Sequence, residues 1–161
     1  MANGPIVPSM NYRPETIDWR LTRGVISRRF WAYMIDLVVV ALWVFFVFFA
    51  LAVLGPFTLG LTWLLMLIGL PVAAFTFVIY NAVTIGGRSQ ATVGMRMTGL
   101  RVVDSVTRGR PSVLAAAVHA LLFYVAAPTF VLWAGDILVG LVRDDRRFAR
   151  DLLTGLTFIR A

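Results

Sequence analysis

Long apolar stretches alternate with short polar segments along the chain, and two of these stretches are long enough to cross a membrane. The first covers residues 30–55 and ends at a Gly-Pro pair, and the second covers residues 58–85. Each exceeds the ~20 residues that a transmembrane helix needs. The connection between them carries no charge. We therefore predict a hairpin of two transmembrane helices, the second of which is kinked at Pro71.

A third apolar stretch, residues 111–142, is too long for one straight helix across a bilayer. At ~1.5 Å per residue such a helix would be about 48 Å long, whereas the hydrocarbon core is ~30 Å thick. Pro128 lies near the middle, within "AAPT". We expect two short helices, 112–126 and 129–142, that turn back at this point and form a shortened hairpin. A single tilted helix, which would leave the end of the chain on the opposite side, is the alternative.

The polar segments complete the predicted fold. Residues 1–24 hold three prolines and mixed charge, so we expect an irregular cytoplasmic segment before a single membrane domain, residues 25–161. "LRVVD" at 100–104 is rich in β-type residues and could pair with "LTFI" at 156–159. The predicted fold class is an all-α integral membrane protein with two full transmembrane helices, a shortened helical hairpin and a small cytoplasmic β pairing.

Composition and charge favour a membrane protein and argue against a nucleic-acid partner. Hydrophobic residues make up 60% of the chain, against about 45–50% in soluble domains. The net charge is +7, and all basic residues are arginines that fall in three blocks, 13–29, 88–110 and 143–160. Such blocks are typical of cytoplasmic loops. We therefore expect both termini in the cytoplasm and the arginine-rich face against anionic lipid headgroups.

The sequence contains no motif typical of catalysis or metal binding. It has no cysteine and one histidine, and it has neither a phosphate-binding loop nor a nucleophile elbow. We therefore expect no enzyme, no cofactor and no bound metal.

Polar residues interrupt the apolar stretches, one in each segment. They are Asp36, Asn81, His119 and Asp136, and each lies seven to nine residues from an arginine at the cytoplasmic end of its segment. That spacing places them at a similar depth, roughly 10–14 Å inside the membrane boundary. Ionisable groups inside a membrane are costly and are commonly functional. We expect these four side chains to form a buried polar layer.

Two interpretations of this layer stay open. Carboxylates and an imidazole can change charge near neutral pH, and carboxylate and amide oxygens suit monovalent cations. This favours a small transporter or proton/cation exchanger that works as a homo-oligomer. Alternatively, the polar side chains only hold short helices together. This favours an accessory or assembly subunit that packs against other membrane subunits.

The first apolar helix begins with "RRFWAYMID" and carries Arg29 and Asp36 on one face. Seven residues separate them, about 10 Å along the axis, which exceeds the reach of i+3 and i+4 pairs. Tyr33 lies between them on the same face. We expect a polar stripe without a direct salt bridge, so Asp36 needs a partner from another segment. The candidates are the other members of the layer: Asn81, His119 and Asp136.

Three stretches in chain order, "RRFWAYMID", "ATVGMRMTGLRVVD" and "DDRRFARDLLTGLTFI", resemble the motifs of the RDD family of bacterial membrane proteins. The resemblance implies a multi-pass protein of the bacterial inner membrane. The residues that match the family's name are Arg29, Asp36 and Asp151, with Arg28 as the alternative for the first. Those that match its loop motif are Thr92, Gly94, Arg96 and Arg101. The chain departs from the pattern at Ala91, Met95 and Arg150, where the family has Gln, Lys and His.

Aspartates and arginines alternate over residues 144–151, close to the expected membrane surface. A solvated face explains such a run without any site. The functional interpretation is that Asp151 binds an arginine of the 88–110 loop, either Arg96 or Arg101, and so fixes the fold or closes a cytoplasmic gate.

Overall fold

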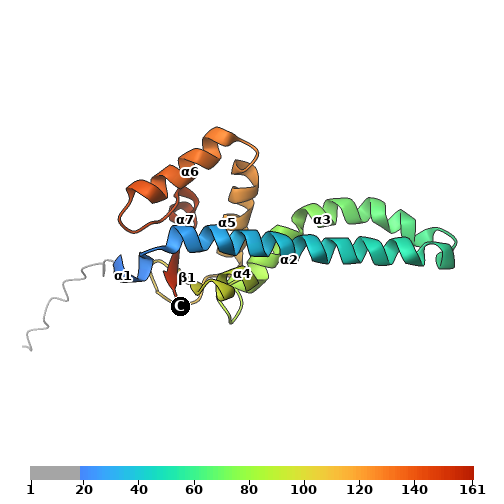
Figure 1. Ribbon diagram of the computed structural model, residues 1–161, viewed down its shortest axis with the longest axis horizontal. Helices are drawn as coiled ribbons and strands as arrows, with labels where there is room; N and C mark the ends of the chain where they lie inside the picture. The colour runs from blue at the N-terminus through green and yellow to red at the C-terminus, as the bar shows by residue number, and fades with distance from the viewer. Residues whose placement is uncertain (1–18) are drawn as a thin grey trace, which may run out of the picture.

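In the computed structural model, which describes residues 19–161, a long helical hairpin projects from a smaller folded head (Figure 1). We use "distal hairpin" for residues 37–80 and "head" for residues 25–36 together with 81–161. The elements are α1 (Trp19–Thr22), α2 (Val25–Leu54), the 3-10 turn η1 (Pro56–Thr58), α3 (Leu61–Ile85), α4 (Val93–Met97), β1 (Leu100–Asp104), α5 (Val113–Ala126), α6 (Phe130–Val142), α7 (Ala149–Thr154) and β2 (Leu156–Arg160).

The expected irregular segment 1–24 is tested only in part. Residues 1–18 lie outside the described residues, whereas Trp19–Thr22 form the single turn of α1 rather than irregular chain. The C-terminal residue Ala161 lies at the same end of the long hairpin as α1 (Figure 1).

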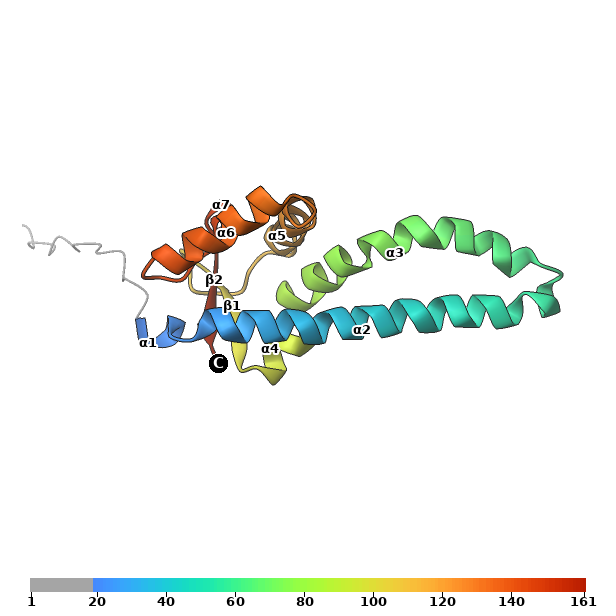
Figure 2. The same ribbon diagram turned by 45° about the horizontal axis from the view of Figure 1, so that its top comes forward.

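The two expected transmembrane helices are confirmed. Helix α2 has 30 residues and α3 has 25, and both are long and apolar enough to cross a membrane. Helix α2 begins before the expected start of the span, because the polar "VISRR" continues the helix into the head. Helix α3 contains Pro71 and bows away from α2 along its length, as expected of a proline-containing helix (Figure 2).

The tip of the hairpin is closed by a tight contact between its two arms. The indole nitrogen of Trp63 donates a hydrogen bond to the Ala52 carbonyl oxygen at 3.2 Å. A Cβ atom on Gly55 would lie 1.7 Å from the Trp63 indole nitrogen, so only glycine leaves room for this ring.

The third apolar stretch forms two helices, as predicted, and the single tilted helix is wrong. Helices α5 and α6 have 14 and 13 residues and meet at the turn that contains Pro128. They form a V beside the first third of α2 and do not run along the distal hairpin (Figure 1). The Ser112 hydroxyl caps α5 by accepting a hydrogen bond from the Ala115 N–H.

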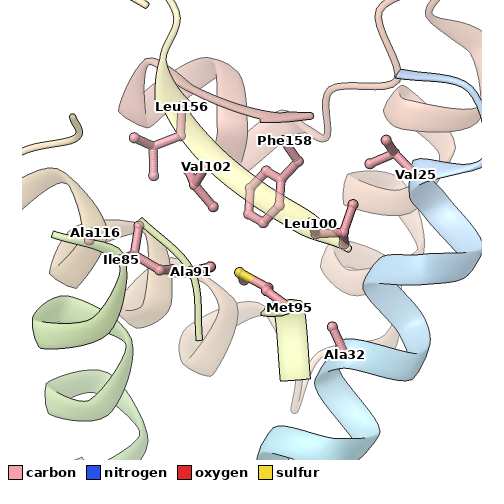
Figure 3. Close-up of a cluster of buried hydrophobic side chains, with 10 residues drawn as sticks. All are labelled: Val25, Ala32, Ile85, Ala91, Met95, Leu100, Val102, Ala116, Leu156 and Phe158. Atoms are coloured by element: carbon pink, nitrogen blue, oxygen red, sulfur yellow. The ribbon is translucent and has the colours of Figure 1, made fainter. Parts of the chain in front are cut away.

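The predicted β pairing is confirmed as a two-stranded antiparallel sheet in which Val102 lies opposite Phe158. Side chains from this sheet pack with residues from the helix ends to form the core of the head (Figure 3). The core residues are Val25, Ala32, Ile85, Ala91, Met95, Leu100, Val102, Ala116, Leu156 and Phe158.

Helix α4 joins the arginine-rich loop to α2 at a very close approach. A Cβ atom on Gly94 would lie 2.1 Å from the Ala32 carbonyl oxygen, so this position accepts no side chain. Thr92 caps α4, since its hydroxyl accepts a hydrogen bond from the Met95 N–H at 3.1 Å. The first helix and the loop are therefore locked together one turn before Asp36.

Candidate functional site

A buried ion pair joins the beginning and the end of the described chain. Arg29 donates two hydrogen bonds to Asp151, at 2.6 Å and 2.7 Å to the two carboxylate oxygens. His119 Nε2 lies 2.8 Å from Asp151 Oδ1, and the Phe148 N–H donates to Oδ2 at 2.8 Å. One carboxylate thus connects α2, α5 and the start of α7.

Two phenylalanine rings enclose the Arg29 guanidinium. Its central carbon lies 3.9 Å from the centre of the Phe148 ring and 3.7 Å from that of Phe158. A planar guanidinium suits both a bidentate carboxylate and aromatic faces. Burial alone would raise the pKa of Asp151, but the Arg29 charge and the hydrogen bond with His119 hold this pKa well below its usual range.

Asp36 forms a second buried centre that holds the loop onto α2. The Thr92 hydroxyl donates to Oδ2 at 2.5 Å, the Gly94 N–H donates to Oδ1 at 2.8 Å, and the Tyr80 hydroxyl donates to Oδ1 at 2.7 Å. Tyr80 in turn accepts a hydrogen bond from the Val93 N–H at 2.9 Å. All the donors to Asp36 in the described part of the chain are thus hydroxyl or backbone N–H groups, and none is a charged side chain.

A third pair lies between α6 and α7. The backbone N–H of Arg150 donates to Asp136 Oδ1 at 2.9 Å, and the Arg150 Nη1 lies 3.4 Å from Oδ2. That second contact lacks hydrogen-bond geometry, so Asp136 Oδ2 and Arg150 Nε are both buried without a hydrogen-bond partner. Burial and the neighbouring Arg29 charge lower the pKa of Arg150 to about 10.

Asn81 differs from these centres because it bonds only within its own helix. Its amide nitrogen donates to the Phe77 carbonyl oxygen at 2.8 Å, and the residue is 7% exposed. Asn81 therefore makes no polar contact between helices.

A cavity of about 390 Å³ lies among α2, α3, α5, α6, α7 and β2. Its polar lining residues are Arg29, Tyr33, Asp36, Asn81, His119 and Arg150. Most of the remaining wall is apolar and includes Phe30, Met34, Phe77, Phe123, Trp133 and Ile137. The cavity volume falls within the range of small-molecule sites, about 300–1,000 Å³.

The expected polar layer is buried, but its members do not bond to one another. Asp36, Asn81, His119 and Asp136 are 3%, 7%, 7% and 7% exposed. The first three line the cavity and Asp136 does not. Asp36 was expected to bind one of the other three, and this is wrong because Tyr80, Thr92 and Gly94 supply its donors.

The prediction that Asp151 binds Arg96 or Arg101 is also wrong. Arg96 and Arg101 are exposed on the loop and strand, and Asp151 pairs with Arg29 and His119 instead. The first turn of α7 lies against α5 and faces α2, which places the carboxylate inside the head. As the spacing of Arg29 and Asp36 predicts, these two residues do not pair with each other: each has partners of its own.

Tyr80, which binds Asp36, and the two rings that enclose Arg29, Phe148 and Phe158, were not predicted from the sequence. Tyr80 adjoins Asn81 in an apolar stretch, and a tyrosine in such a stretch also needs a hydrogen-bond partner, which was the available signal. The two phenylalanines carry no comparable signal, since nothing local distinguishes a ring that stacks on arginine from an ordinary core residue.

Comparison with known proteins identifies a family and nothing closer. No curated protein and no solved structure matches the chain. The sequence model of the RDD family matches residues 23–155, a range that includes α2 with Arg29 and Asp36, the loop with Thr92 and Gly94, and α7 with Asp151. With that match over most of its length and two helices that can span a membrane, the chain belongs to the RDD family of membrane proteins.

Proposed function

We propose that the protein is a small membrane transporter that binds its solute in the cavity of the head. The observation that carries the proposal is the lining of this cavity, which brings buried polar groups from α2, α3, α5 and α7 around one space of about 390 Å³. Polar groups that converge on an otherwise apolar cavity are typical of ligand sites.

The hydrogen bonds around the carboxylates favour a bound solute over a proton relay through aspartate. Asp36 accepts three hydrogen bonds and Asp151 accepts bonds from Arg29, His119 and the Phe148 N–H. Each oxygen of both carboxylates already accepts a hydrogen bond within the protein, so neither carboxylate offers a free oxygen to a proton relay. Asn81, His119 and Arg150 line the cavity and are available for direct contact with a solute.

The proposal places the head at the cytoplasmic side of the bacterial inner membrane. The start of α2 and the C-terminus lie at the same end of the long hairpin, which agrees with both termini in the cytoplasm (Figure 1). Exposed arginines of the head, including Arg96 and Arg101, would then contact anionic lipid headgroups. Two spans cannot enclose a pathway by themselves, so transport requires a homo-oligomer.

A second candidate function is an accessory or assembly subunit without transport activity. The observation that favours it is the outer face of α6, where Phe130 is 74% exposed, Val131 75% and Val142 83%. Such a face needs cover from lipid or from another membrane subunit.

Flux measurements in liposomes test the proposal with a variant that leaves the contacts between helices intact. Asn81→Leu removes a polar group from the cavity and breaks only the bond to Phe77 within α3. Thr76→Val is the matched control, because Thr76 also bonds only within α3, to the Val72 carbonyl oxygen at 3.1 Å, and does not line the cavity.

Two solute classes are measured in parallel. Sodium- and potassium-driven proton movement is followed with an encapsulated pH dye, and transfer of a fluorescent lysophosphatidate is followed by its reduction with external dithionite. We expect flux in at least one arm, a fall of about tenfold in Asn81→Leu and no change in Thr76→Val. Absence of flux in both arms, or equal flux in both variants, would refute the transporter and favour the accessory subunit.

A further inference from the structure

We propose that the cavity takes an amphipathic anion, whose carboxylate or phosphate head lies against Arg150 and whose apolar tail lies along the aromatic wall. This inference names the solute class of the transporter proposed above and rests on that proposal for its role in transport. The binding site itself follows from the contacts of Arg150, the composition of the cavity wall and the charges already neutralised around it.

The first observation is that the Arg150 guanidinium donates no hydrogen bond to any residue that the structure describes. Its side chain is 15% exposed, its Nε is buried without a partner, and its closest carboxylate oxygen, Asp136 Oδ2, lies 3.4 Å away outside hydrogen-bond geometry. An arginine carries five N–H donors in a fixed fork that matches carboxylate and phosphate groups. The buried Nε lacks an acceptor, which is costly, and an anionic head would supply acceptors to this donor and to the rest of the fork.

The second observation is the apolar wall next to this guanidinium. The central carbon of Arg150 lies 4.6 Å from the centre of the Phe123 ring, and Phe123 itself packs against Tyr33 and Phe77 at 5.1 Å and 6.0 Å between ring centres. Trp133 and Ile137 of α6 line the same cavity. A tail that leaves the head at Arg150 would therefore lie against aromatic and aliphatic groups throughout.

The third observation concerns the other charges around the cavity. Arg29 is neutralised by the bidentate contact with Asp151, and Asp36 is satisfied by three hydrogen-bond donors. Asp136 does not line the cavity. Of the charged side chains that line the cavity, Arg150 is the one whose ionic group makes no hydrogen bond in the described part of the chain, and its Nη1 faces Asp136 Oδ2 at 3.4 Å. A cation in this position favours an anion over a cation as the ligand.

Trp133 provides a direct test, because it lines the cavity. In a variant that keeps Trp133 and has phenylalanine at the other tryptophans (19, 31, 43 and 63), the emission reports contact with a brominated tail. The probes are 11-bromoundecanoate, a lysophosphatidate with a brominated chain, and 11-bromoundecanol, which has the same tail without charge. A second reporter protein that keeps only Trp43, which is 63% exposed on the distal hairpin, measures unspecific contact in the micelle.

We expect saturable quenching of Trp133 by at least one of the two anions. The alcohol should require about tenfold higher concentration, as should either anion with Arg150→Gln, because each change removes the charged hydrogen bonds. Arg101→Gln, which removes an exposed arginine that does not line the cavity, is the matched control and should bind as the parent protein does. Comparison of the carboxylate with the phosphate probe identifies the head.

Two outcomes would overturn the site: quenching that never saturates and equals that of Trp43, or equal affinity for the anions and the alcohol. If Arg150→Gln does not fold, Ile137→Phe replaces it, since a larger side chain on the cavity wall should weaken binding about tenfold without a change of charge. Binding without flux would refute the proposed transport and support the anion site. Cation flux without binding would refute the amphipathic anion as the ligand and support transport.

Discussion

The head and the distal hairpin are both rich in apolar residues but are stabilised in different ways. Between residues 37 and 80 the only buried residue is Gly55 at the tip, so nearly every side chain of the distal hairpin faces outward. This part of α2 and α3 carries no ionisable aspartate, arginine or histidine. The α2 portion, residues 37–54, is about 27 Å long at ~1.5 Å per residue and so matches the ~30 Å hydrocarbon core.

The head, in contrast, combines a small apolar core with buried polar bonds between segments that are distant in sequence. Arg29 and Asp151 are separated by 122 positions, and Asp36 and Gly94 by 58. Arg29, Asp36 and Asp151, the residues that the resemblance to the RDD family singled out, all lie in the head and make bonds between elements. The hairpin therefore depends on surrounding lipid for its stability, whereas the head depends on specific polar partners.

The largest effect should follow from the loss of the Asp151 charge. Asp151→Asn leaves Arg29 buried without its counter-ion, and breaking one side of a buried pair costs about 3–5 kcal/mol. We expect the head to become sensitive to proteinase K, which cleaves with little sequence preference, while the distal hairpin stays protected in the micelle. Limited proteolysis with mass spectrometry measures both parts in one experiment.

The control is the double variant Arg29→Leu with Asp151→Leu. Replacing both partners of a buried pair by apolar residues is often close to neutral, so protection of the head should return in part. Equal sensitivity of the single and double variants would show that the aromatic cage of Arg29, and not charge balance, holds the head together.

Acid should weaken the same contact by protonating Asp151. The pKa of this carboxyl is lower in the folded head than the unfolded value of about 3.9. Its contribution to stability is therefore fully present above about pH 4 and is lost as the pH falls through the folded pKa. Unfolding in mixed micelles at a series of pH values should show stability falling below about pH 4, with a flatter profile in the Arg29→Leu, Asp151→Leu variant. An identical profile in that variant would assign the acid response to other carboxyls.

The sequence was sufficient to predict the longer helices and the two strands, because each of these elements rests on a local pattern. Long apolar runs marked α2 and α3, Pro128 marked the turn between α5 and α6, and β-type residues marked the two strands. The partners inside the head were not predictable in the same way. The candidate partners of Asp36 were the polar residues that interrupt the other apolar stretches, whereas Asp36 is bound by two hydroxyls and a backbone N–H, which carry no charge pattern.

The Arg29–Asp151 pair shows a second reason why contacts inside the head could not be predicted from the sequence. Spacing excluded a bond between Arg29 and Asp36 correctly, since both lie on one helix and helical geometry is known. Spacing could not show that Asp151 pairs with Arg29 and not with Arg96 or Arg101. That choice depends on how α7 lies against α5 and α2. The family resemblance singled out Arg29, Asp36 and Asp151 but predicted no contact between them.

A moderate effect should come from Gly94, where the head packs most closely. Gly94→Ala would place a Cβ atom 2.1 Å from the Ala32 carbonyl oxygen, and the backbone would have to move apart. Overpacking of this kind costs about 1–3 kcal/mol and should also lengthen the bond from Gly94 to Asp36. Gly109→Ala is the control, since its nearest neighbour, the Thr107 hydroxyl, would lie at 3.4 Å. Denaturation in mixed micelles should separate the two variants, and equal stabilities would contradict the close packing of α4 on α2.

The smallest effect on folding should come from the distal hairpin. Leu42 is 51% exposed on α2 with no buried neighbours nearby, so Leu42→Ala should change the stability of the head in micelles by at most about 0.5 kcal/mol. Leu42→Arg should likewise leave the head intact in micelles, yet it should reduce membrane insertion, because a charge at the centre of a span costs about 2.5–3.5 kcal/mol. An insertion assay beside the proteolysis assay separates these quantities. Loss of the head in the Leu42→Arg variant in micelles would contradict the division between a lipid-dependent hairpin and a head stabilised by its own polar bonds.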